Sequence, residues 1–207
     1  MSAGIERTPI DFKERPGSPK TIKVKAVCKP CNNKWMSGLE TKVRRWLEPV
    51  IKLERVELAP EAKRVLAEYI MLKVFVADQN RNGEVYFTNE ERNAFYARRD
   101  IPDGVVITVM RFIADFHPMV EQYFKVAMLF DSVIAEDVSL NPANFTFCVG
   151  PLFIQLLSLR KIKARVEQDA SFGFIIFPAN GETVFWPPPN TISPEQAHTL
   201  QRLFLNR

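Results

Sequence analysis

The stretch NFTFCVGPLFIQLLSL, residues 144–159, contains two apolar runs rich in Phe, Leu, Ile and Val on either side of a Gly-Pro pair. Runs of such residues bounded by turn residues are typical of β-strands. Segments of similar character occur on both sides of it, at residues 105–115, 123–131, 164–168 and 172–178. Together these segments predict an antiparallel sheet in the second half of the chain.

Helical patterns precede the predicted sheet. Pro60 suits a first helical position, and the apolar residues of segment 60–78 wrap most of a helix circumference, which predicts a buried central helix. Thr88 and Glu91 form a capping box that opens a short charged helix. From residue 34 onward, apolar residues recur at three- and four-residue spacing and predict an amphipathic helix, whose buried stripe is Trp35, Leu39, Val43, Trp46, Leu47 and Val50.

A last helix is predicted near the C-terminus. Ser193 is its cap, Pro194 its first residue and Gln196 the capping-box partner, and these precede the apolar Leu200, Leu203 and Phe204. Helices, then a sheet, then a helix predict an α+β fold. We expect three parts: a flexible arm, a strand-turn-helix unit and an α+β domain packed on it, at residues 1–20, 21–56 and 57–207.

Composition narrows the class of protein. The 207 residues are 46% hydrophobic, enough for a substantial core. No apolar run approaches the roughly 20 residues that cross a membrane, and the polar start lacks the apolar core of a signal peptide. We therefore expect a cytoplasmic protein without a membrane partner, in which three cysteines indicate metal binding or free thiols rather than disulfides.

Positive charge is concentrated at the start of the chain. Residues 1–56 carry 13 Lys and Arg against 6 Asp and Glu, whereas the remainder carries 15 against 18. Such an excess can attract nucleic-acid phosphates, because neutralised phosphates release counterions. A solvated surface with no partner is the alternative interpretation.

The basic segment contains the stretch VCKPCNNKWMSGLE, residues 27–40. Residues 21–28 alternate apolar and basic side chains and predict a strand, after which Cys28 and Cys31 form a zinc-knuckle-like turn and Asn32 or Asn33 caps the next helix. A structural zinc ion requires four ligands, and the chain has no second cysteine pair. We expect Cys148 to be a small buried side chain, His117 to be a turn residue and His198 to be a surface residue of the last helix.

The run C-x-x-C-N-N-x-W-M-S-x-L-E over residues 28–40 resembles the second half of an HNH-type endonuclease module, and the likeness extends more loosely to the helix at 60–78 and the later WPP segment. The resemblance implies a β-hairpin and a helix that grip a divalent ion. It also implies a first-strand histidine that activates water, and a metal-positioning residue that Asn32 matches. Upstream of Cys28 this sequence has no histidine and no first C-x-x-C, so the unit at 21–56 is interpreted as a degenerate, HNH-like ββα half.

The missing base predicts a non-catalytic binding protein on a nuclease scaffold. Its partner would be nucleic acid or a nucleoprotein complex, the latter as for an anti-CRISPR-type inhibitor of phage or bacterial defence. The predicted nucleic-acid contacts are Lys23, Lys25, Lys29, Lys34, Lys42 and Arg45. The alternative is a metal-dependent endonuclease whose N-terminal catalytic half is missing from this chain.

Metal binding is the remaining open question. We expect a monomer without a cofactor, because the helical stripe can be buried without zinc. The alternative is a zinc-bridged dimer in which two copies of Cys28 and Cys31 supply four thiolates.

Overall fold

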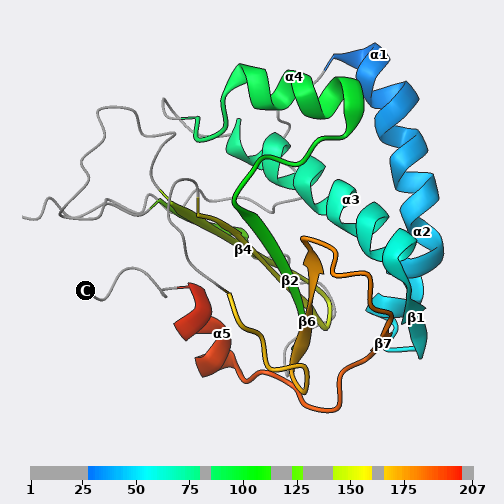
Figure 1. Ribbon diagram of the computed structural model, residues 1–207, viewed down its shortest axis with the longest axis vertical. Helices are drawn as coiled ribbons and strands as arrows, with labels where there is room; N and C mark the ends of the chain where they lie inside the picture. Colours follow the sequence, from blue (N-terminus) through cyan, green and yellow to red (C-terminus); the bar gives the residue numbers. More distant parts are fainter. Residues whose placement is uncertain (1–27, 80–84, 113–122, 128–141, 160–165, 202–207) are drawn as a thin grey trace, which may run out of the picture.

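The computed structural model describes residues 28–79, 85–112, 123–127, 142–159 and 166–201. They form the predicted α+β fold, with antiparallel sheets and a helix near the C-terminus (Figure 1). The predicted arm, all but the last residue of the predicted first strand, and Leu203 and Phe204 lie outside these ranges. Within the described residues, no helix combines the length and apolar character that crossing a membrane requires.

The first three helical elements run into one another without a break. They are α1 (Lys29–Cys31), the π-helical turn η2 (Asn32–Met36) and α2 (Ser37–Ile51), and the residues at their junctions keep right-handed helical dihedrals. We call residues 29–51 the leading helix. It packs against α3 (Pro60–Asp78), whose buried residues face several directions, so the predicted central helix is confirmed.

Both predicted capping boxes are confirmed. Thr88 Oγ1 accepts the Glu91 N–H at 3.2 Å, and the Thr88 N–H donates to Glu91 Oε2 at 2.8 Å. Ser193 and Gln196 exchange the same two bonds at 3.2 and 2.8 Å. The helices that follow these boxes are α4 (Asn89–Arg98) and α5 (Pro194–Gln201).

Five antiparallel strands form the main sheet. Their order across it is β3 (Tyr123–Ala127), β4 (Ala143–Val149), β5 (Leu152–Ser158), β2 (Val105–Arg111) and β6 (Gly173–Phe177). The predicted strand at 164–168 is wrong for residues 166–168, which are irregular. Val166 is the only apolar residue among these three, so the segment has little apolar surface to bury against a sheet. A second sheet pairs β1 (Val56–Leu58) with β7 (Val184–Trp186).

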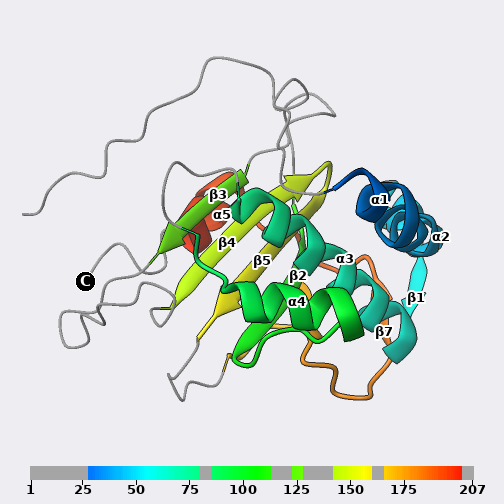
Figure 2. The ribbon, with the colours of Figure 1, turned by 90° about the horizontal axis from the view of Figure 1, so that it is seen from above.

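The main sheet separates two layers. Leu152, Ile154 and Leu156 of β5 join the large core cluster under the helices, whereas Phe153 faces the smaller cluster near α5 with Cys148. This alternation follows from the period-two geometry of a strand. Figure 2 shows α3 and α4 over one face of the sheet, with α2 beside α3 and α5 on the other side. The core cluster includes residues on both sides of the predicted boundary at residue 56, and that division stays a prediction.

Candidate nucleic-acid interface

The leading helix begins at the cysteine pair. Cys28 is its N-cap: the Cys28 Sγ accepts the Cys31 N–H at 3.2 Å, and the Cys28 carbonyl accepts the Asn32 N–H at 3.0 Å. Pro30 stands in the first turn, where a missing N–H costs no helical hydrogen bond. The cysteine turn is therefore the first turn of a helix.

This arrangement corrects two expectations. The helix begins before residue 34, and the predicted cap at Asn32 or Asn33 is wrong, because the Cys28 side chain already caps the helix ahead of both residues. The predicted knuckle turn is likewise helical. Its two Sγ atoms lie 2.7 Å apart, with Cys28 exposed and Cys31 half-buried.

The two thiols have opposite electrostatic surroundings. Hydrogen bonds from the Cys31 side chain and then from its backbone N–H hold the pKa of Cys28 below its ordinary value. The pKa of Cys31 is raised, first by its hydrogen bond to Cys28 and then by burial, although Trp35 opposes the rise. Cys28 is thus the thiol that ionises more readily.

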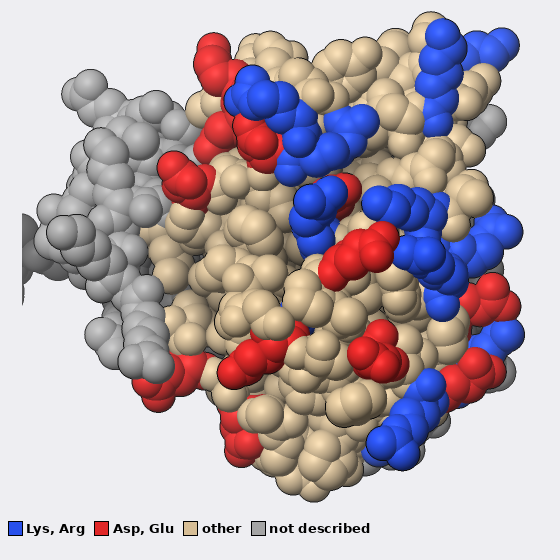
Figure 3. Space-filling view, turned by 45° about the vertical axis from the view of Figure 1, so that its right-hand side comes forward, with Lys and Arg blue, Asp and Glu red and all other residues tan. Residues whose placement is uncertain are grey.

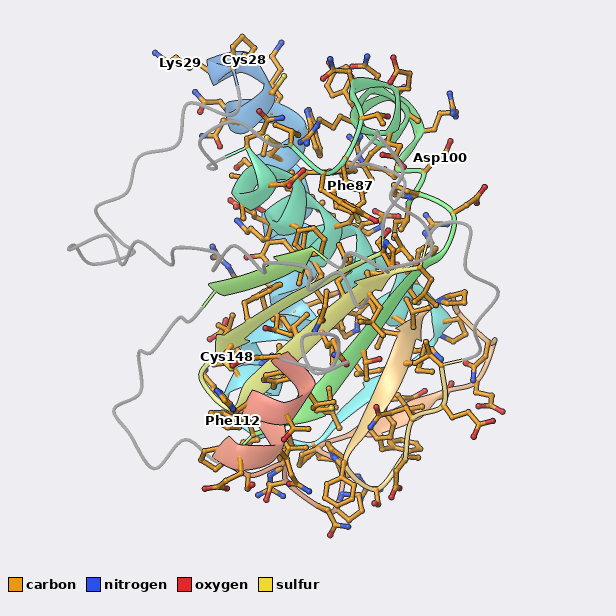
Figure 4. The ribbon with its side chains drawn as sticks, turned by 90° about the vertical axis from the view of Figure 1, so that its left-hand side faces the viewer. Cys28, Lys29, Phe87, Asp100, Phe112 and Cys148 are labelled. Carbon is orange, nitrogen blue, oxygen red and sulfur yellow. The ribbon has the colours of Figure 1, made fainter. Side chains whose placement is uncertain are left out.

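Asn32, the residue matched to the HNH motif, is exposed beside the cysteine pair. His198, the single histidine within the described ranges, lies on α5 across the sheet from the helical layer (Figure 1). Cys148 also lies near α5, far from Cys28 (Figure 4), and burial raises its pKa to about 11. In the described part of the chain, no group of three or more His, Cys, Asp or Glu residues is placed to hold a metal ion.

The predicted cations fall into three groups. Lys23 and Lys25 lie outside the described residues. A second group is exposed, with no ion pair to any described residue: Lys29, Lys34 and Lys42. Arg45 differs, because it pairs with Glu61 at 3.0 Å and its guanidinium lies 3.7 Å from the ring centre of Trp46.

Arg44, which the prediction did not include, is also exposed and without an ion pair among the described residues. The two carboxylates of the leading helix are both engaged: Glu40 accepts from Lys73 of α3 at 2.7 Å, and Glu48 accepts from Lys52 at 2.8 Å. Figure 3 shows one face of the molecule. Lys and Arg side chains are gathered over its upper and right-hand parts, with carboxylates between them. The exposed side of the leading helix therefore carries cations that form no ion pair with a described carboxylate.

A cleft of about 1150 Å³ adjoins Lys42, between the leading helix, α3 and the end of α4. Two of its arginines are paired with carboxylates, Arg64 with Glu68 at 3.2 Å and Arg98 with Asp100 at 2.6 Å. Its remaining arginine, Arg99, bonds backbone carbonyls at the end of α4, including that of Phe95 at 2.8 Å. Because these arginines already have partners, the cleft adds little unpaired positive charge to the surface at Lys42. The sequence shows the Arg98-Arg99 pair at a helix C-terminus, where cations are favoured, but it does not show the cleft.

An aromatic cluster supports the first turns of the leading helix. Trp35 packs edge-on against Phe95 and Tyr96, with ring centres 6.2 and 5.8 Å away, and the Arg99 guanidinium lies 3.9 Å from the ring centre of Trp35. Trp35 is half-buried and packs against the core, as expected for a stripe residue. Its buried indole Nε1 has no hydrogen-bond acceptor among the described atoms.

Comparison of the chain with family models, with curated proteins and with solved structures finds no match.

Proposed function

We propose that this chain is a non-catalytic protein that binds nucleic acid through the exposed side of the leading helix. One observation carries the proposal: four exposed cations on this helix have no ion pair among the described residues, while both of its carboxylates are engaged. These cations are Lys29, Lys34, Lys42 and Arg44.

The four cations extend along the leading helix and are spread over more than half of its circumference, so the proposed contacts are with phosphates at several positions around the helix. At about 1.5 Å of rise per residue, Lys29 and Arg44 are separated by roughly 20 Å along the helix, or about six phosphate spacings of one strand. Trp35 and Trp46 are half-buried, so they do not present free faces for base stacking. The expected mode is therefore contact with the phosphate backbone, which is independent of base sequence and sensitive to salt.

Binding can be measured by fluorescence anisotropy with a short labelled DNA duplex over a series of salt concentrations. In the double variant Lys34→Gln/Lys42→Gln we expect weaker binding at low salt. The slope of log K against log salt should become shallower by about 2, or about one for each lost phosphate contact. Circular dichroism checks that the variant keeps its fold.

The matched control is Arg55→Gln/Arg111→Gln, which removes the same charge from positions outside the leading helix. Arg55 lies over the ring of Phe185 and Arg111 is on β2, so this control should bind almost as tightly as the wild-type chain. Equal losses in both double variants would show that net charge alone matters and would overturn the proposed surface. A wild-type chain that does not bind the duplex even at low salt would overturn nucleic-acid binding itself. A protein partner would then be favoured, and its affinity should respond less to salt.

A nicking assay separates this function from the endonuclease alternative. Supercoiled plasmid incubated with the chain and Mg²⁺ or Mn²⁺ should stay intact, because this sequence has no histidine upstream of Cys28 and His198 lies across the sheet from Asn32. Metal-dependent nicking that disappears in Asn32→Ala would contradict the non-catalytic assignment.

A further inference from the structure

The cysteine pair has a geometry that the proposed nucleic-acid contacts do not use. Cys28 caps the leading helix and Cys31 ends its first turn, so the capping geometry brings the two thiols together. Their Sγ atoms are 2.7 Å apart, and the Cys31 N–H also points to the Cys28 sulfur at 3.2 Å. The two sulfurs can therefore join without rearrangement of a distant segment.

The same distance fits zinc poorly. Two thiolates bound at about 2.3 Å to a tetrahedral zinc ion lie about 3.8 Å apart, so the observed pair would have to separate by about 1 Å. The other described cysteine and the described histidine offer no help, because Cys148 and His198 belong to the α5 side of the sheet. A disulfide bond would require the sulfurs to approach by about 0.7 Å, which is a smaller change.

The two thiols are unequal in access. Cys28 is exposed, whereas Cys31 is half-buried and packs against the core cluster. Trp35 stands beside Cys31, and its buried indole N–H has no acceptor among the described atoms. A sulfur anion at Cys31 would give that N–H an acceptor. The Trp35 side chain lowers the pKa of Cys31, which agrees with its position beside that thiol.

We propose that Cys28 and Cys31 are a thiol–disulfide exchange pair, with Cys28 as the attacking thiol and Cys31 as the resolving thiol. The Cys28 thiolate attacks a low-molecular-weight disulfide, forms a mixed disulfide and releases one thiolate, which takes a proton from solvent. Cys31 loses its proton and attacks the Cys28 sulfur, which closes the Cys28–Cys31 disulfide and releases the second thiolate. The dithiol is oxidised by two electrons, and one disulfide is reduced to two thiols.

The test equilibrates the full chain with defined mixtures of reduced and oxidised glutathione, followed by acid quenching and mass spectrometry of peptides. We expect one two-electron transition to an intramolecular Cys28–Cys31 disulfide. In Cys31→Ser, Cys28 should accumulate as a mixed disulfide with glutathione. In Cys28→Ser, the remaining Cys31 should react at least about tenfold more slowly, because it is half-buried whereas Cys28 is exposed.

The matched control is Cys148→Ser, in which the transition should keep its midpoint, since Cys148 lies in the cluster near α5. Absence of the intramolecular disulfide in wild-type chain under excess oxidised glutathione would overturn the proposal without any variant. Equal reaction rates of Cys28 and Cys31 in the single variants would overturn their assigned roles. One zinc ion for every two chains, with both thiols protected from glutathione, would replace the proposal with the zinc-bridged dimer. DNA affinity is measured separately, so either proposal can fail without the other.

Discussion

The leading helix and α3 lie side by side in the helical layer (Figure 2), but they expose very different surfaces. Over most of its length α3 is enclosed, and it buries even charged residues: Lys63, Glu68 and Asp78. The leading helix buries one stripe, Met36, Leu39, Val43 and Val50, and exposes most of its charged residues. The first arrangement serves stability, and the second leaves a surface available to a partner.

The neighbours of the two helices explain this difference. α3 has contacts with the leading helix and with β6, and α4 closes over its C-terminal end, where the rings of Phe75 and Phe95 are 5.2 Å apart. The leading helix makes its largest interhelical contact with α3. Substitutions in α3 should therefore affect unfolding, and substitutions on the outer side of the leading helix should affect binding.

The largest expected effect is at the C-terminal end of α3. Asp78 is fully buried. Its carboxylate accepts hydrogen bonds from the backbone N–H groups of Tyr86 and Phe87, both at 3.0 Å, and from Arg92 Nη2 at 2.7 Å. Asp78→Ala would leave the partly buried Arg92 without this partner and should lower the free energy of unfolding by about 3–5 kcal/mol. Urea denaturation measures this change.

The control for Asp78→Ala is Glu40→Ala on the leading helix. Glu40 also accepts from a cation, Lys73 at 2.7 Å, but both side chains of that pair are substantially exposed. Its loss should cost only about 0–1 kcal/mol. Comparable losses in the two variants would contradict the division of roles between the helices.

A smaller contrast uses the same substitution in both helices. Leu66 of α3 is 3% exposed, whereas Leu47 of the leading helix is half-buried. Leu66→Ala should cost about 2–5 kcal/mol, because it removes apolar contacts and leaves a cavity. Leu47→Ala should cost about 1–2 kcal/mol, since water can fill part of the space that it leaves. Urea denaturation of both variants gives the two values, and a larger loss for Leu47→Ala would break the comparison.

Most of the helices could be predicted because their signals are local. The capping boxes at Thr88 and Ser193 and the apolar periodicity of residues 60–78 act within one or a few turns of chain. The start of the leading helix could not be predicted with the same means. A C-x-x-C pair after an alternating segment fits a zinc knuckle as well as a helix cap, and the helical dihedrals at Cys31 and Asn32, with the bond from the Asn32 N–H to the Cys28 carbonyl, identify the helix.

The candidate interface was harder to predict, because the availability of a charge depends on partners far away in the chain. Arg45 and Arg44 are adjacent in sequence, yet Arg45 pairs with Glu61 of α3 whereas Arg44 has no ion pair among the described residues. The cleft beside Lys42 likewise brings residues of α3 and the end of α4 together. The sequence pattern predicts a basic face on the helix. It does not predict which of its cations pair with carboxylates of other helices, because those pairs depend on how the helices pack.

The smallest expected effect is the pH response of Glu48 at the end of the leading helix. The hydrogen bond from Lys52, then its charge, and to a lesser degree the charge of Arg44 hold the pKa of Glu48 below its usual value. Because the folded-state pKa is lowered, the pair contributes to stability above the unfolded-state pKa, and this contribution is lost as pH falls through the folded-state pKa.

NMR titration of the Glu48 carboxyl measures this response directly. Lys52→Met should raise the pKa of Glu48 more than Arg44→Gln does, since Lys52 supplies the hydrogen bond as well as a charge. The urea midpoint at neutral pH should hardly move in either variant, because the pair is exposed to water and lies on the outer side of the leading helix. A Glu48 pKa that is unchanged in Lys52→Met would show that the pair does not persist in solution. A marked loss of stability in that variant would mean that this exposed surface supports the fold as α3 does.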